Sequence, residues 1–218
     1  MQNFQVINWC RFFAALFLIA VMFGGFSSAQ TTKNQNRRVK GQILTSEEMP
    51  KIRLKFDKKF KFAGSQEFVL YDRAKAEQYF FVEAENQKIK RMYMLQFEGF
   101  LPNIKATYDY NEPQSVAIGG LKYFSNTEIV PNVSLALERV PDSDIARAAK
   151  FLQDKGFKLM NSIIYQRFVR VVDENKRNEF IFLYIEDSEN TDVNNSAQKE
   201  KMLQGLRERA LANFKTLK

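Results

Sequence analysis

The chain has 218 residues and a formal net charge of +8, from 33 Lys or Arg against 25 Asp or Glu. It contains no histidine and one cysteine, Cys10. The usual ligand sets for zinc and copper are therefore missing, and so are Ser-His-Asp and Cys-His catalysis. We accordingly predict no metal site, no cofactor and no catalytic residue, and an enzyme is the less favoured class.

The first 29 residues have the pattern of a signal peptide for export. Arg11 is their only charge, the run 12–26 is apolar or small, and small residues end at Ala29. A membrane span needs roughly twenty apolar residues, more than this run supplies. We therefore predict cleavage between Ala29 and Gln30, with an uncleaved membrane anchor as the alternative.

Cleavage would leave a mature protein without a thiol, since Cys10 lies in the signal peptide. Disulfides are common outside the cytoplasm, but this chain would form none. We expect a periplasmic or extracellular location. The remaining basic charge would also suit contact with anionic envelope surfaces.

The mature chain is expected to form a single domain behind a short lead. Residues 30–48 are polar and basic, with few side chains to bury, and predict a flexible lead. Residues 49–218 are enough for one domain with its own core. Within it, 51–57 alternates apolar and basic residues as a half-buried strand does, and 67–72 is a second strand.

The clearest feature is a hairpin formed by residues 78–85 and 88–101. The two residues between these runs, 86–87, would form its loop. A two-residue loop places Glu83 opposite Lys90, which is a favourable cross-strand pair of charges.

The segments after this hairpin predict two helices. Residues 102–141 contain several prolines and favour short strands joined by long loops. A middle helix is expected to begin after Pro141 and to end at Gly156. A C-terminal helix is expected from Ser196 almost to Lys218, with its apolar face docked on a sheet and its basic face outward.

A second hairpin is formed by residues 162–173 and 179–186, with 174–177 as its loop. Both hairpins are apolar at consecutive positions, as in the run 180–185, so both faces of the sheet must be covered. The cover could be the chain itself, more sheet, a partner or a ligand cavity. The predicted fold class is α+β: a mostly antiparallel, twisted sheet built from two long hairpins plus short strands, with a middle helix and a C-terminal helix.

Five residues in these apolar strands are the candidate ligand-binding residues: Gln96, Glu98, Arg167, Tyr184 and Glu186. Gln96 and Glu98 share a face of the first hairpin. A four-residue loop in the second hairpin puts Arg167 and Glu186 on one face, where they would pair diagonally, because a buried charge needs a partner. The polar residues then form either the anchor of a ligand cavity or a structural ion pair.

Three stretches, residues 77–82, 96–102 and 166–187, resemble a group of exported bacterial proteins to which no function is assigned. The resemblance covers roughly residues 50–190. It implies a bacterial envelope or extracellular setting. It implies no catalytic or binding residue that can be transferred to this chain.

Three functions remain open. The first is an exported, non-enzymatic binding domain whose aromatic sheet holds an apolar or amphipathic small molecule or another envelope protein. The second is a glycosidase-like hydrolase that uses Glu98 or another strand carboxylate in a pair. The third is a basic protein held on anionic envelope or membrane surfaces by its C-terminal helix. No nucleic-acid partner is expected, since no known binding motif is present.

Overall fold

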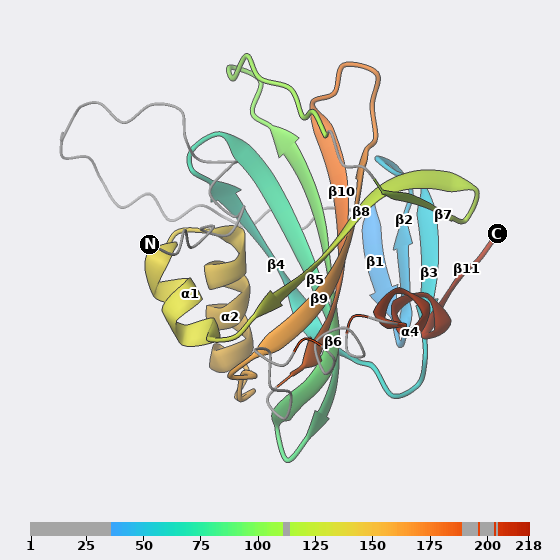
Figure 1. Ribbon diagram of the computed structural model, residues 1–218. Helices are drawn as coiled ribbons and strands as arrows, with labels where there is room; N and C mark the ends of the chain where they lie inside the picture. Colours follow the sequence, from blue (N-terminus) through green and yellow to red (C-terminus); the bar gives the residue numbers. More distant parts are fainter. Residues whose placement is uncertain (1–35, 111–113, 189–195, 197–202, 204) are drawn as a thin grey trace, which may run out of the picture. The chain divides into compact units, whose positions relative to one another are not determined.

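Figure 1 shows the computed structural model, which describes residues 36–110, 114–188, 196, 203 and 205–218. The described residues all belong to one unit of the chain, Lys33–Lys218. The predicted signal peptide and its cleavage site between Ala29 and Gln30 lie outside the described residues. No helix in the described ranges is long and apolar enough to span a membrane.

The larger of two antiparallel sheets has seven strands in the order β4-β5-β6-β10-β9-β8-β7. The two expected hairpins, β5–β6 and β9–β10, lie side by side at its centre because β6 pairs with β10. Its strands are β4 (Lys61–Leu70), β5 (Ala74–Glu85), β6 (Lys88–Phe100), β7 (Ser115–Ile118), β8 (Leu121–Val130), β9 (Ile163–Val171) and β10 (Asn178–Asp187).

The smaller sheet has four strands in the order β1-β2-β3-β11. They are β1 (Arg37–Lys40), β2 (Ile43–Ser46), β3 (Ile52–Phe56) and β11 (Phe214–Thr216). The prediction of a flexible lead over residues 30–48 is therefore wrong from residue 37 onward. Val39 and Leu44 supply the reason, because Val39 packs on the core and Leu44 is fully buried in it.

An aromatic core joins the two sheets. The Phe56 ring of β3 stacks on Phe81 of β5 with 4.1 Å between ring centroids, and it meets Phe182 of β10 edge-on at 6.3 Å. The ring centroids of Phe214 of β11 and Phe182 lie 4.8 Å apart. The chain itself therefore covers this face of the seven-stranded sheet, which we call the aromatic face.

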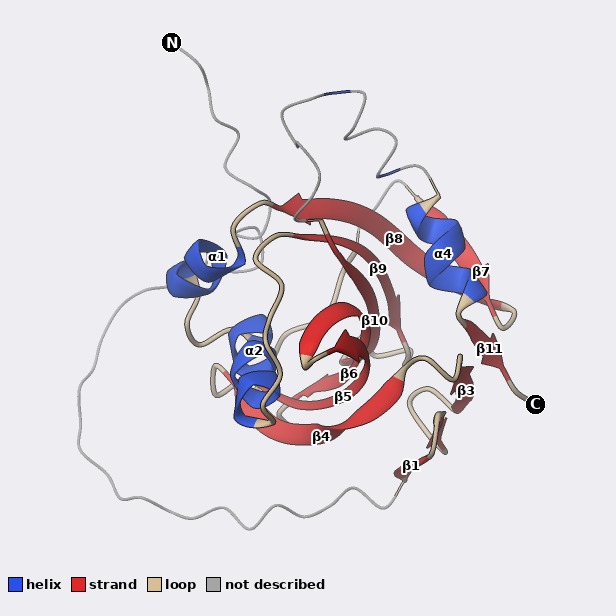
Figure 2. Cartoon of the chain, turned by 90° about the horizontal axis from the view of Figure 1, so that it is seen from below, coloured by secondary structure: helices blue, strands red, loops and turns tan. Residues whose placement is uncertain are grey.

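Helix α2 (Asp144–Asp154) covers part of the opposite face, so that it and the four-stranded sheet lie on opposite sides of the large sheet (Figure 2). Ser143 caps it by accepting a hydrogen bond from the Ala146 amide. The Phe151 ring stacks on Phe80 of β5 at 5.0 Å. The predicted middle helix and its end near Gly156, where the backbone φ is +85°, are confirmed.

Two further helices are short. Helix α1 (Val133–Arg139) precedes α2, and α4 (Leu206–Ala212) lies near the C-terminus. A C-terminal helix with its apolar side docked on the sheet is confirmed, since Leu206 and Ala210 are fully buried. The prediction that it runs almost to Lys218 is wrong, because Phe214 leaves the helix to pair with Phe56 and enters the core as part of β11.

The first hairpin has the predicted two-residue loop. Asn86 and Gln87 both have positive φ, 47° and 65°, as a hairpin turn of this length requires. A register shift after Glu83 changes the expected pair, so that Glu83 faces Arg91 and forms an ion pair at 2.6 Å. The predicted pairing with Lys90 is therefore wrong by one residue.

The second hairpin also differs from the prediction by one residue. A backbone hydrogen bond from Val172 to Asn178 closes a loop of five residues, 173–177. Asp173 stabilises it by accepting hydrogen bonds from the amides of Arg177 and Asn178. The register places Arg167 opposite Leu183. A slip of one residue moves a side chain to the other face, so Arg167 and Glu186 lie on opposite faces and do not pair.

Candidate functional site

A row of three glutamines crosses the α2 face of the seven-stranded sheet. Gln66, Gln78 and Gln96 lie opposite one another on β4, β5 and β6. Each amide donates to the next at 2.6 Å, and Gln96 Nε2 then donates to Glu98 Oε2 at 2.6 Å. Gln78 and Gln96 are fully buried, so the row satisfies polar groups that burial would otherwise leave unpaired.

The row ends at three carboxylates, Glu98, Asp144 and Glu179, which we call the carboxylate cluster. Glu98 of β6 lies directly opposite Glu179 of β10. Gln96 Nε2 also donates to Asp144 Oδ2 at 3.1 Å, which brings the first turn of α2 to the same place. Glu179 is buried with 4% exposure, whereas the residues Glu98 and Asp144 are half-buried.

Burial raises the pKa of all three carboxyl groups. The pKa of Glu98 rises to about 7 through burial and the negative charge of Asp144, against hydrogen bonds from Tyr108 and Gln96 that lower it. Burial, then the charge of Glu98, raises the pKa of Glu179 well above its ordinary value. The cluster therefore retains a proton near neutral pH, as close carboxylates in a poorly solvated site do.

Arg167 is the cation of this site. Its Nε donates to Asn126 Oδ1 at 2.7 Å, and its guanidinium lies 5.6 Å from the ring centroid of Tyr110. Its charge lowers the pKa of Asp144 and Glu179, against the larger effect of burial. The structure thus brings together Gln96, Glu98 and Arg167, three of the five residues that the sequence analysis selected.

The other two selected residues lie on the aromatic face. Tyr184 is fully buried, and its hydroxyl donates to Glu186. The Glu186 carboxylate accepts two hydrogen bonds from the Arg209 guanidinium of α4, at 2.9 and 3.0 Å. Tyr184 and Glu186 therefore help to attach α4 to β10 rather than joining Gln96, Glu98 and Arg167.

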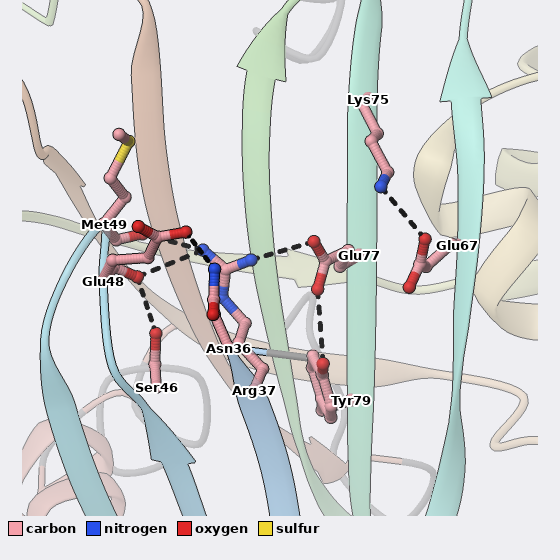
Figure 3. A network of polar contacts seen from close by, with 9 residues as sticks. All are labelled: Asn36, Arg37, Ser46, Glu48, Met49, Glu67, Lys75, Glu77 and Tyr79. Carbon is pink, nitrogen blue, oxygen red and sulfur yellow. Dashed lines mark hydrogen bonds and ion pairs between the residues drawn. The ribbon is translucent and has the colours of Figure 1, made fainter. Parts of the chain in front are cut away.

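A groove of about 320 Å³ opens beside the end of β6. We call it the Arg37 groove, and its lining includes Arg37, Met49, Lys75, Phe97, Phe100 and Leu101. Glu98 also belongs to the lining, although its carboxylate bonds to Gln96 on the α2 face of β6 and Phe97 lies on the aromatic face. The groove joins residues of β1 and the segment after β2 to residues of β5 and β6. Figure 3 shows Arg37 of β1 and Glu48 of the segment after β2 beside Glu77 of β5.

Arg37 forms a buried ion pair with Glu77 at 2.8 Å, their side chains being 8% and 6% exposed. Its Nη2 donates to the carbonyls of Glu48 and Met49, both at 3.2 Å (Figure 3). The guanidinium lies over the Phe97 ring, 4.1 Å from its centroid. Among the described residues, its Nε is buried and has no hydrogen-bond acceptor.

The sequence analysis missed Arg37, Glu77, Asp144 and Glu179. Glu77 and Glu179 did carry a signal, because each is a carboxylate within or beside a run of apolar strand residues. Arg37 carried none, since it stands in a basic segment that reads as a tail. Asp144 reads only as part of a helix start.

Comparisons with known proteins found no matching family model, curated protein or solved structure. Among the described residues, no group of three or more His, Cys, Asp or Glu side chains is placed to hold a metal ion. The geometry of the two neighbouring features, the groove and the cluster, therefore carries the functional argument.

Proposed function

We propose that the protein is an exported binding domain that holds a small amphipathic molecule in the Arg37 groove. The observation that carries the proposal is the groove itself, in which Arg37 lies beside apolar surface from Phe97 and Phe100. The groove is at the lower end of the volume range of small-molecule sites.

The lining favours a ligand with an apolar body and an uncharged polar end. Phe97, Phe100 and the half-exposed Met49 offer apolar surface. The charged residues of the lining include both signs, and the Arg37 charge is already balanced by Glu77. A carbonyl, ester or amide oxygen therefore suits this lining better than a full negative charge does.

The ligand surface proposed here is an edge of the aromatic sheet, where Phe97 lines the groove, rather than the centre of that sheet. Rings of both sheets fill the aromatic face, with Phe56, Phe81 and Phe182 all nearly or fully buried. That face holds the two sheets together. The export setting rests on the signal-like segment 1–29 and on the resemblance to exported bacterial proteins.

Native mass spectrometry of the protein purified from its source tests the proposal. We expect a bound small molecule on the wild type, its loss in Arg37→Met, and its retention in Arg38→Met. Arg38 is a matched control because it is the next residue of β1, has a side chain that is 65% exposed, and pairs with Glu47. A ligand-free wild type, or full retention by Arg37→Met, would contradict the proposal.

A hydrolase that uses two carboxylates is the second candidate, and one observation favours it. Glu98 and Glu179 face each other on paired antiparallel strands, where opposed Cβ atoms lie about 5 Å apart. Retaining glycosidases need a carboxyl separation of about 5 Å, with one acid of raised pKa. Release of nitrophenol from aryl glycosides, measured for wild type, Glu98→Gln and Glu179→Gln, tests this candidate; a wild-type rate equal to that in buffer rejects it.

Attachment to anionic surfaces, the third expectation, draws little support from α4. Arg209 of this helix is paired with Glu186, and Arg207 donates to Gln114 at 2.6 Å. Two other basic residues of the expected helix, Lys199 and Lys201, lie outside the described residues. We therefore do not assign a surface-binding role to α4.

A further inference from the structure

The four-stranded sheet turns one face toward the aromatic core and the other toward solvent. Its inward face buries Leu44, Leu54 and Phe56 in the core. Side chains alternate between the two faces of a sheet, so the neighbours of these residues along each strand point outward. The charged residues at the described outward positions are all basic and exposed: Arg38, Lys40, Arg53, Lys55 and Lys215. We call this set the basic face.

Strand register gathers these charges into two rows across the sheet. The paired outward residues are Lys40, Ile43, Lys55 and Lys215 in one row, and Arg38, Thr45 and Arg53 in the next. In the first row, Lys55 of β3 lies directly opposite Lys215 of β11. Like charges at directly opposed positions destabilise a sheet. An anionic partner would remove this repulsion.

The two arginines of the basic face already have partners. Arg38 pairs with Glu47 at 3.0 Å, although their side chains are 65% and 44% exposed. Exposed ion pairs of this kind contribute little to stability. The Nη1 of Arg53 donates to the backbone oxygen of Lys218 at 2.8 Å.

The three lysines of the basic face have no acidic partner in the part of the chain that the structure describes. Lys40, Lys55 and Lys215 form no ion pair there. On the exposed side of α2, by contrast, Lys150 pairs with Asp154 at 2.9 Å. The positive charge of the lysines is therefore left for a partner outside these ranges.

Protection of sheet edges explains only some of these residues. Lysines on edge strands commonly prevent unwanted pairing with another chain. That role suits Lys40 and Lys215, because β1 and β11 are the edge strands of this sheet. It does not suit Arg53 and Lys55, since β3 is paired on both sides, with β2 and with β11. Basic charge on an inner strand needs another reason.

The composition of the basic face favours a lipid surface over a nucleic acid. Its described uncharged positions hold Ile43 and Thr45, and none is aromatic. A single-stranded nucleic acid would need aromatic rings on which its bases stack. An anionic bilayer needs only clustered basic side chains, because its negative surface potential attracts each of them.

We propose that the basic face docks the protein on an anionic phospholipid bilayer, with its lysines at the headgroup phosphates. This surface differs from the C-terminal helix that the sequence favours for membrane contact. Docking leaves the Arg37 groove free, because Arg37 points to the other side of β1 and pairs there with Glu77 of β5. The inference goes beyond the proposed function, since the basic face binds a bilayer whether or not the groove holds a ligand.

Co-sedimentation of the protein purified from its source with two kinds of vesicle tests the docking. One kind is phosphatidylcholine alone, and the other contains about one quarter phosphatidylglycerol. We expect binding to the second kind only, and a loss of binding as salt is raised, because salt screens exposed charges. Lys55→Glu/Lys215→Glu should weaken this binding at least about tenfold.

Lys90→Glu/Lys105→Glu is the matched control for the double variant. It changes the net charge by the same amount at two exposed lysines outside the four-stranded sheet. Its binding to the anionic vesicles should stay within about twofold of the wild type, because salt screens charges that lie away from the bilayer.

Lys55→Glu alone separates binding from folding. It places opposite charges across β3 and β11, which is a favourable cross-strand pair. Its urea midpoint should therefore be at least that of the wild type, while its binding to anionic vesicles falls. Equal wild-type binding to both kinds of vesicle, an equal loss in the control variant, or tighter wild-type binding to duplex DNA than to anionic vesicles would each overturn the proposal.

Discussion

The two faces of the seven-stranded sheet differ in kind, although the same strands form both. On the aromatic face, Tyr93 and Phe97 of β6 pack with rings from β10 and the four-stranded sheet. On the α2 face of the same strand, Met92 and Met94 lead to Gln96 and then to Glu98. One face is a dry core, and the other passes from apolar to titratable along a single strand.

The difference teaches where stability and pH response are located in this protein. Rings buried against rings gain free energy that does not depend on protonation. Amides and carboxyl groups buried in a row contribute little net free energy, but the contribution of the carboxyl groups depends on pH. Changes on the first face should alter stability at every pH, and changes on the second should alter its pH dependence.

The largest expected effect comes from breaking the aromatic face. Phe56→Ala should lower the free energy of unfolding by about 3–5 kcal/mol, because the ring contacts both sheets and leaves a cavity. Urea denaturation at pH 6 and pH 8 should show the same loss at both. Phe62→Ala, whose residue is 37% exposed, should cost about 1 kcal/mol or less. A loss at Phe56 no larger than at Phe62 would contradict a core that joins the sheets.

A smaller effect, of opposite sign, is expected on the α2 face. Burial and the charge of Asp144 raise the pKa of Glu98 from 4.5 to about 7, so the folded state holds a proton that the unfolded state releases. The wild-type free energy of unfolding should therefore fall as pH rises from about 4.5 to 7. Glu98→Gln should abolish this fall with pH and should raise the free energy of unfolding at pH 8 by about 1–2 kcal/mol over that of the wild type.

Glu174→Gln is the control for this titration, because Glu174 is exposed in the loop between β9 and β10. It should leave the pH profile of urea unfolding unchanged. A Glu98→Gln variant that is less stable than wild type at pH 8, with the wild-type pH profile, would show that Glu98 acts there as a charged hydrogen-bond acceptor.

The smallest expected effects come from the N-terminal caps of α2 and α1. Ser143→Ala removes the cap of α2 and should cost about 1 kcal/mol by urea unfolding. Asn132→Ala removes the corresponding cap of α1, which accepts from the Leu135 amide, and should cost less because α1 has no buried residue. Equal losses would mean that the docking of α2 does not add to the effect of its cap.

Much of the fold could be predicted because it follows from local patterns. The loop at Asn86 and Gln87, the helix start after Pro141 and the helix end near Gly156 each depend on a few neighbouring residues. The candidate site was predicted in part. Gln96 and Glu98 were placed on one face by their spacing alone, but Asp144 reaches them from a distant helix.

The errors came where one residue of register or a distant contact decides the outcome. A shift after Glu83 and a five-residue loop before Asn178 each moved a predicted pair. The sequence predicts a flexible segment around Arg37, because no local pattern shows that Arg37 pairs with Glu77, which lies in a strand forty residues later.

The sequence by itself determined the class of fold, the absence of histidine chemistry and the consecutive apolar residues that give β5, β6, β9 and β10 two covered faces. These depend on composition and on a period of two residues, which need no knowledge of distant contacts. Only the tertiary structure decided that Glu98 faces Glu179, that Asp144 joins them, and that Arg37 is buried beside a groove. The physical reason is that strand register and packing between sheets are set by the whole chain folding together, and these decide which polar groups share one poorly solvated place.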